Sequence, residues 1–183
     1  MDRLHATLPV FVKRHAWNLK YGLLGYPRFV APEDALQFLK TGLSDNQNIL
    51  ELGCGRGALL QGLRSAGWLG TYCGVDISAR AIRDARKLHD QRSAWSVSAF
   101  ESFQSQFQWD AVAMIESICY VKLALVPELL TRIMGMLKDE GFLLVRLHDI
   151  EKHRAYINEM RRHLPQTEQV DNNLFRAAKV SHS

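Results

Sequence analysis

A glycine-rich turn is the part of the sequence with the clearest chemical potential. It follows the apolar run 48–52 directly and precedes a helical pattern that starts near Ala58. Glycine has no Cβ atom, so the backbone can approach a ligand closely, and the first N–H groups of the following helix face that ligand. The turn therefore predicts a nucleotide-type binding site, with a simple tight turn as the alternative. Its glycines are Gly53, Gly55 and Gly57.

Two carboxylates near this turn bear on which ligand it binds. Asp76 stands about twenty residues further on, where an acid that contacts ribose hydroxyls belongs. The spacing Gly53-x-Gly55-x-x-Ala58 also satisfies the dinucleotide pattern, so spacing alone leaves both kinds of cofactor open. Glu51, two residues before the first glycine, would repel a pyrophosphate and attract a cation. Charge therefore favours a positively charged nucleoside.

Four segments resemble the motifs of class I S-adenosylmethionine-dependent methyltransferases. Residues 49–57 (ILELGCGRG) resemble the first motif, and residues 74–78 (GVDIS) resemble the second. Residues 109–112 (WDAV) are similar to the family's entry into strand four, and residues 137–143 (LKDEGFL) to its turn before strand five. The segments follow the family's order. The resemblance implies a methyltransferase that uses S-adenosyl-L-methionine and releases S-adenosyl-L-homocysteine.

The resemblance implies a role for each matching residue. The backbone at Gly53, Cys54 and Gly55 would surround the methionine part of the cofactor. Glu51 would lie near its ammonium group, and Asp76 would bind the ribose hydroxyls.

The adenine contacts are less defined. Ile77 would flank the adenine, but Ala99 stands where the family usually has an acid that holds the adenine amine. Phe100 could supply a stacking face or a backbone contact, or be a core aromatic. The cofactor-binding candidates are Glu51, Gly53, Cys54, Gly55, Gly57, Asp76, Ile77, Ala99, Phe100 and Ile115.

The acceptor is expected beyond the carboxyl ends of the strands, beside residues 115–120. Glu116 could orient an amine or accept a proton from a hydroxyl, or instead close the site or cap a helix. Tyr120 could donate a hydrogen bond to the acceptor or simply pack. His148, at the end of strand five, could act as a base because its ordinary pKa suits that task, or be a surface or capping residue.

An aromatic leader is expected to fold over the cofactor as a lid, as in similar methyltransferases. Trp17, Tyr21 and Tyr26 would exclude water and attract a cation, although packing against the sheet would also explain them. The final helix, through Tyr156 and Arg161, is expected to contribute to the acceptor site.

Short β-rich runs alternate with helical patterns, which predicts parallel βαβ units. We expect an α/β, Rossmann-like, mostly parallel sheet with helices on both faces and a C-terminal antiparallel hairpin. The expected strands are 48–52, 71–75, 95–97, 111–115, 142–147, 167–170 and 174–180. The expected helices are 32–43, 58–66, 79–88, one from Pro127, and 150–164.

Length and composition predict one soluble, cytoplasmic domain. Its 183 residues divide into a helical leader or lid (1–44), a cofactor-binding core (45–150), and a final helix with a hairpin (151–183). The three cysteines form no C-x-x-C pair and the histidines no H-E-x-x-H, so we expect neither disulfides nor a metal. The net charge of +4 is compatible with an anionic partner without requiring one.

The residues after strand four restrict the acceptor class. They lack the N/D-P-P-Y/F box of enzymes that methylate DNA amines. RNA 3′-end methyltransferases have a metal-binding Glu and His in this region. The corresponding residues here are Cys119 and Tyr120, so those metal ligands are missing. We therefore expect a small-molecule or peptide acceptor, such as a natural product, methylated on nitrogen or oxygen without a membrane partner. The alternatives are an RNA or other macromolecular acceptor, an NAD(P)-dependent oxidoreductase, and a non-catalytic binding module; a homodimer could help close the site.

Overall fold

The computed structural model of the chain describes residues 7–22 and 29–180. Within them, the strands form one sheet in the order β3-β2-β1-β4-β5-β7-β6. Strands β1 to β5 are parallel, whereas β7 is antiparallel to both β5 and β6. The strands are β1 (Asn48–Leu52), β2 (Thr71–Asp76), β3 (Ser93–Val97), β4 (Trp109–Ile115), β5 (Leu137–Arg146), β6 (Thr167–Asp171) and β7 (Leu174–Ala178).

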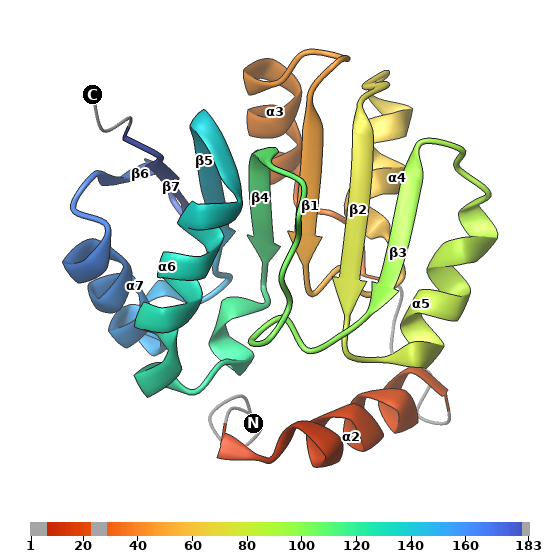
Figure 1. The fold of residues 1–183 in the computed structure, drawn as a ribbon, viewed down its shortest axis with the longest axis horizontal. Helices are drawn as coiled ribbons and strands as arrows, with labels where there is room; N and C mark the ends of the chain where they lie inside the picture. Colours follow the sequence, from red (N-terminus) through yellow and green to blue (C-terminus); the bar gives the residue numbers. More distant parts are fainter. Residues whose placement is uncertain (1–6, 23–28, 181–183) are drawn as a thin grey trace.

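Helices cover both faces of the sheet. α3 and α4 pack on one face, α6 and α7 on the other, and α5 lies beside β2 and β3 (Figure 1). α2 runs across the edge at which β1 to β4 end (Figure 1). No described helix is both long enough and apolar enough to cross a membrane. The helices are α2 (Val10–Gly22), α3 (Glu33–Gly42), α4 (Ala58–Ser65), α5 (Ala79–Ala85), α6 (Val126–Met136) and α7 (Ile150–His163), with 3-10 turns at Arg86–Leu88, Ile118–Tyr120 and Leu123–Leu125.

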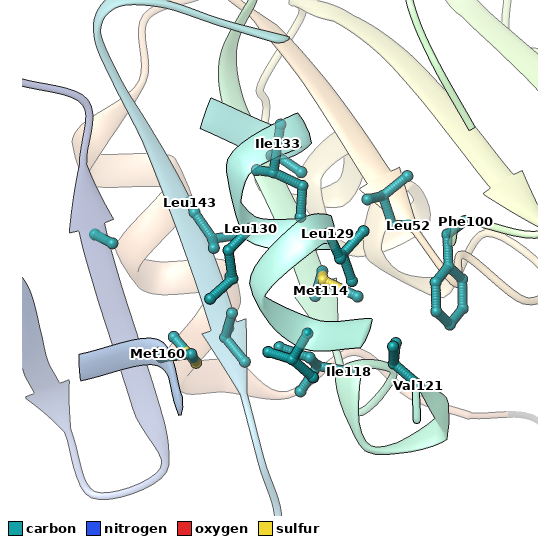
Figure 2. Packing of buried hydrophobic residues seen from close by; sticks show 14 of the residues in the cluster. Leu52, Phe100, Met114, Ile118, Val121, Leu129, Leu130, Ile133, Leu143 and Met160 are labelled. Atoms are coloured by element: carbon teal, nitrogen blue, oxygen red, sulfur yellow. The ribbon is translucent and has the colours of Figure 1, made fainter. Parts of the chain in front are cut away.

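The apolar core lies on both faces of the central strands. All residues from Ala111 to Ile115 in β4 are buried, as expected for a parallel strand covered on both sides. Figure 2 shows one of these faces, where Leu130 and Ile133 of α6 pack near Leu143 of β5. This packing holds the strand ends in place, and those ends form the base of the site.

The structure confirms the α/β, Rossmann-like sheet and its C-terminal hairpin, which turns at Asn172 and Asn173. Local signals also place helix ends correctly. Ser78 caps α5, since its side chain accepts a hydrogen bond of 3.2 Å from the Ala81 N–H. Gly67 follows α4 with φ +88°, the left-handed conformation that ends many helices.

The start of β5 differs from the prediction, in which residues 139–141 turn the chain ahead of the strand. β5 begins directly after α6, at Leu137, because this fully buried residue already pairs with Trp109 of β4. The ladder then shifts register and resumes with Phe142 opposite Ala111. The intervening residues form an irregularity within the strand.

Candidate functional site

A pocket of about 910 Å³ lies where β1, β2 and β4 end, beside α2. Its size falls within the range of small-molecule and cofactor sites, roughly 300–1,000 Å³. The predicted residues that line it are Trp17, Tyr21, Glu51, Gly53, Cys54, Gly55, Asp76, Ile77, Phe100, Ile115, Glu116 and Tyr120. Gly57, Ala99 and His148 are not among its lining residues, and Tyr26 lies outside the residues that the structure describes.

The glycine turn is tied to β2 and is closely covered. The N–H groups of Gly53 and Cys54 both donate to the Val75 carbonyl, at 2.7 and 3.0 Å. Gly53 has φ +89°, and a Cβ atom there would overlap the Ser117 side chain. Gly55 has φ +53°, and a Cβ atom there would stand 2.9 Å from the Tyr21 hydroxyl. Conformation therefore favours glycine at both positions, and at Gly53 the space taken by Ser117 requires it as well.

Gly57 serves packing instead of lining the pocket. It precedes α4 with φ +79°, and a Cβ atom there would come within 2.6 Å of the Trp95 ring and 2.9 Å of Leu88. The third glycine of the motif thus lets the start of α4 approach β3. Ala99 is likewise buried without reaching the pocket, whereas Phe100 beside it lines the pocket wall.

Asp76 ends β2 and is held by backbone donors. Its two carboxylate oxygens accept hydrogen bonds from the N–H groups of Gly55, at 2.9 Å, and Ser78, at 2.8 Å. Asp76 is 7% exposed, and burial raises the pKa of its carboxyl to about 6. The two backbone contacts partly oppose that rise and fix the carboxylate at the pocket wall.

Glu51 is the second buried carboxylate of the pocket, with 4% of its surface exposed. The Tyr72 hydroxyl donates a hydrogen bond to it. Burial raises the pKa of Glu51 to about 7, the Tyr72 contact lowers it, and the charge of Asp76 raises it further. Among the described residues, no basic side chain pairs with Glu51 or Asp76. The pocket therefore contains two buried acids, and neither forms an ion pair with a basic side chain in the part of the chain that the structure describes.

Glu116 lies at the end of β4 with φ +55°, an uncommon conformation for a residue with a side chain. Its carboxylate forms an ion pair with Arg146 and accepts a hydrogen bond of 2.8 Å from the His148 backbone N–H. The His148 ring lies outside the pocket, 55% exposed, with Nδ1 2.6 Å from Glu116 Oε2. Arg146 is also held by Asp34 of α3, at 2.8 Å. The structure thus brings Glu116 into the pocket within a charged network that the sequence did not indicate.

α2 lies beside the pocket, and Trp17 and Tyr21 of the aromatic leader line it. Trp17 contacts Tyr120 edge to face, with ring centroids 5.1 Å apart. Trp17 also packs against Tyr21 in a tilted arrangement, with ring centroids 5.8 Å apart. Lys13, which sequence reasoning missed, is 6% exposed and donates to Glu101, at 2.6 Å, and to the Tyr120 carbonyl, at 2.9 Å. In the sequence, only the apolar residues one helical turn before and after Lys13 indicate that this lysine is buried.

The final helix does not reach the pocket, contrary to expectation. Neither Tyr156 nor Arg161 lines it. Tyr156 is buried, and its hydroxyl donates to the carbonyls of Cys119, at 3.1 Å, and Val121, at 2.8 Å. The helix therefore supports the segment that contains Tyr120, which lines the pocket. Further charged residues that line the pocket are Lys13, Arg56, Arg80, Asp84, Lys87 and Glu101.

A family model and several solved structures of methyltransferases are similar to this chain. Residues 26–179 match the family model of a methyltransferase domain. DhpI, in a complex with S-adenosylhomocysteine, superposes with a TM-score of 0.70 at 15% identity over 92% of this chain and 95% of its own. Magnesium protoporphyrin IX methyltransferase from Synechocystis PCC 6803, with bound S-adenosylmethionine, gives 0.68 at 13% identity over 95% and 99%. The N-methyltransferase NodS from Bradyrhizobium japonicum WM9 gives 0.65 at 16% identity over 81% and 94%. A search of curated proteins finds no match.

The family match covers most of the described chain, including the glycine turn, both buried carboxylates and the end of β4. The solved structures share the fold over nearly their whole length. The enzyme class that the four sequence motifs predict is thereby confirmed. The chain belongs to the methyltransferase domain family.

Proposed function

We propose that this methyltransferase transfers a methyl group from S-adenosylmethionine to a nitrogen or oxygen atom of a small-molecule or peptide acceptor. The cofactor supplies a methyl group already activated on a cationic sulfur. The proposal depends on one observation: two buried carboxylates, Glu51 and Asp76, line the pocket, and no described basic residue pairs with either.

Electrostatics distinguishes the two cofactors that the glycine spacing allows. A buried charge is costly unless it is paired, so the ligand-free protein raises the pKa values of both acids. A cation in the pocket would favour the ionised carboxylates and offset that cost. A diphosphate placed beside Glu51 and Asp76 would meet like charge. The part of the pocket beside these two carboxylates therefore favours a cationic nucleoside over a nicotinamide dinucleotide.

The chain's own residues can hold such a cofactor at several points. Glu51 would bind the methionine ammonium, and Asp76, already oriented by two backbone N–H groups, would bind the ribose hydroxyls. Trp17 and Tyr21 of α2 would exclude water from the methyl group.

The acceptor side favours nitrogen. Arg146 and His148 hold the Glu116 carboxylate at the pocket wall, where it can attract an amine and orient its N–H groups. Because the methyl group is already activated, alignment with the acceptor lone pair can supply roughly 7–11 kcal/mol of the barrier. NodS, which shares the fold, is named an N-methyltransferase and supports this choice. Turnover of matched amine and alcohol panels checks it, and faster methylation of alcohols would contradict it.

Substitution of Glu51 by Gln tests the cofactor. We expect Glu51→Gln to bind S-adenosylmethionine about 10- to 100-fold more weakly in isothermal titration calorimetry, because a hydrogen bond to a charged group contributes roughly 1.5–3 kcal/mol. Glu168→Gln, which changes an exposed carboxylate on β6, is the matched control and should bind normally. A wild-type protein that binds NADH but neither S-adenosylmethionine nor S-adenosylhomocysteine would overturn the proposal.

A further inference from the structure

Tyr72 of β2 lies behind the pocket wall. Its side chain is fully buried and does not line the pocket, yet its hydroxyl donates to Glu51, which does. In the parallel pairing of β1 and β2, Tyr72 lies opposite Ile49 and Glu51 lies opposite Gly74. Tyr72 and Glu51 therefore occupy diagonal positions on the same face of the sheet, within reach of one another.

The surroundings of Tyr72 leave its ring little freedom. The Trp95 ring packs against it with centroids 5.3 Å apart. Gly74, between Tyr72 and Asp76 on β2, has no side chain, and a Cβ atom there would come within 2.6 Å of Trp95 and 2.8 Å of Cys54 Sγ. The missing side chain leaves the space that Trp95 and Cys54 fill. The hydroxyl is consequently held in place toward Glu51.

The charges around Glu51 make this one contact important. Burial and the negative charge of Glu51 raise the pKa of Tyr72, so its hydroxyl stays protonated and acts as a donor. Asp76 faces Glu51 with like charge, and the Cys54 thiol beside it stays neutral because burial raises its pKa. Cys73 on β2 is also neutral, since burial raises its pKa to about 11. Of these described neighbours, Tyr72 is the one that stabilises the ionised form of Glu51 before a ligand arrives.

We propose that Tyr72 is a positioning residue of the methyl-donor site: it holds Glu51 in the orientation and charge state that the cofactor requires. The ammonium group, which the cofactor and S-adenosylhomocysteine share, then completes the ionisation of Glu51 on binding, and the displaced proton leaves to solvent. This inference rests on the proposed function, because Glu51 must be the group that receives the ammonium. Tyr72 would act on cofactor binding through Glu51, without lining the pocket itself.

Tyr72→Phe tests the proposal through proton release. Calorimetric titration with S-adenosylhomocysteine, in two buffers of different ionisation enthalpy, counts the protons released per ligand bound. At about pH 7 we expect Tyr72→Phe to bind about tenfold more weakly and to release more protons than the wild type, because loss of the hydrogen bond raises the Glu51 pKa. The difference in affinity should shrink as the pH rises. Titration of the ligand itself is common to both proteins and cancels in the comparison.

Tyr156→Phe is the matched control, because it removes the hydroxyl of another buried tyrosine that does not line the pocket. It should lower thermal stability while leaving proton release unchanged. In a Glu51→Gln background, Tyr72→Phe should add little to the loss of affinity, since both act through the same carboxylate.

The outcomes separate the two proposals. Wild-type affinity and proton release in Tyr72→Phe would overturn the positioning role, whereas failure of the wild type to bind S-adenosylhomocysteine would overturn the proposed function itself. If Tyr72→Phe does not fold, Glu51→Gln must release fewer protons than the wild type, and an unchanged proton count contradicts the inference.

Discussion

Gly53 is closely confined at the pocket wall. Its φ of +89° favours glycine, and the Ser117 side chain occupies the space that a Cβ atom would need. Ser117 is itself fixed, since its hydroxyl donates to the Leu52 carbonyl at 2.6 Å. The end of β4 therefore packs directly on the turn that follows β1. Gly53 and Ser117 both line the pocket at this point of contact.

A pair of glycine substitutions separates backbone strain from steric overlap. Gly67 has nearly the same φ as Gly53, +88°, but a Cβ atom there would meet nothing within 4 Å. We expect Gly67→Ala to lower the free energy of unfolding by about 1–2 kcal/mol, the cost of the left-handed conformation alone. Gly53→Ala should cost about 3 kcal/mol or more and weaken cofactor binding, because overlap adds to strain. Urea denaturation measures both, and equal losses would show that the Ser117 contact is unimportant.

At the scale of elements, α2 is held over the pocket by contacts spread along its length. Lys13 reaches Glu101, and Asn18 accepts hydrogen bonds from the Ser78 hydroxyl at 2.8 Å and the Arg80 N–H at 3.2 Å. Near the end of the helix, the Tyr21 carbonyl accepts a hydrogen bond of 2.8 Å from Arg56. Polar contacts of this kind can break and reform more readily than an apolar core. Contacts of this kind are compatible with the lid role that we predict for α2.

Lys13→Met tests this arrangement of α2. Removal of the ammonium group leaves Glu101 without its ion pair, so we expect amide hydrogen exchange within residues 10–22 to speed up about tenfold. Arg14→Met, at the adjacent exposed position on the same helix, is the control and should change little. S-adenosylhomocysteine should slow the exchange in the wild type. Identical exchange in the two variants would show that Lys13 does not anchor the helix.

At the scale of the whole molecule, the two buried carboxylates of the pocket lower the stability of the ligand-free protein at neutral pH. Burial raises the pKa of Glu51 from 4.5 to about 7 and that of Asp76 from 3.8 to about 6 in the ligand-free protein. Acids with raised pKa values stabilise the folded state below their unfolded pKa values and lose that contribution as pH rises through the folded values. The fold therefore carries a cost at neutral pH, which a cationic ligand would offset.

This cost predicts a pH dependence of stability. Between about pH 4.5 and pH 8, the two carboxylates should lower the free energy of unfolding of the ligand-free protein by a few kcal/mol, since one pKa unit corresponds to about 1.4 kcal/mol. Urea denaturation across this range measures the decrease. A Glu51→Gln, Asp76→Asn double variant should lose much of it, and S-adenosylhomocysteine should reduce it in the wild type. A double variant with the full wild-type decrease would contradict the assignment.

Local patterns in the chain were sufficient to predict the fold and several of the residues that line the pocket. The glycine turn, Glu51 and Asp76 lie at or beside the ends of strands. Those strand ends can be recognised from neighbouring residues alone, because an apolar run followed by glycine and then by a helical pattern is typical of a strand that leads into a helix. Parallel strands then place those ends at one edge of the sheet. The same logic placed Glu116 at the end of β4.

Contacts between distant segments were decided by the tertiary structure alone. Arg146 joins Asp34 of α3 to Glu116, and Lys13 of α2 joins Glu101, across separations that no local pattern encodes. The Tyr72 contact with Glu51 depends on the register of two strands, since a one-residue slip would move Tyr72 to the other face of the sheet. A local pattern specifies which residues reach a strand end, whereas register and helix packing specify which side chains meet there.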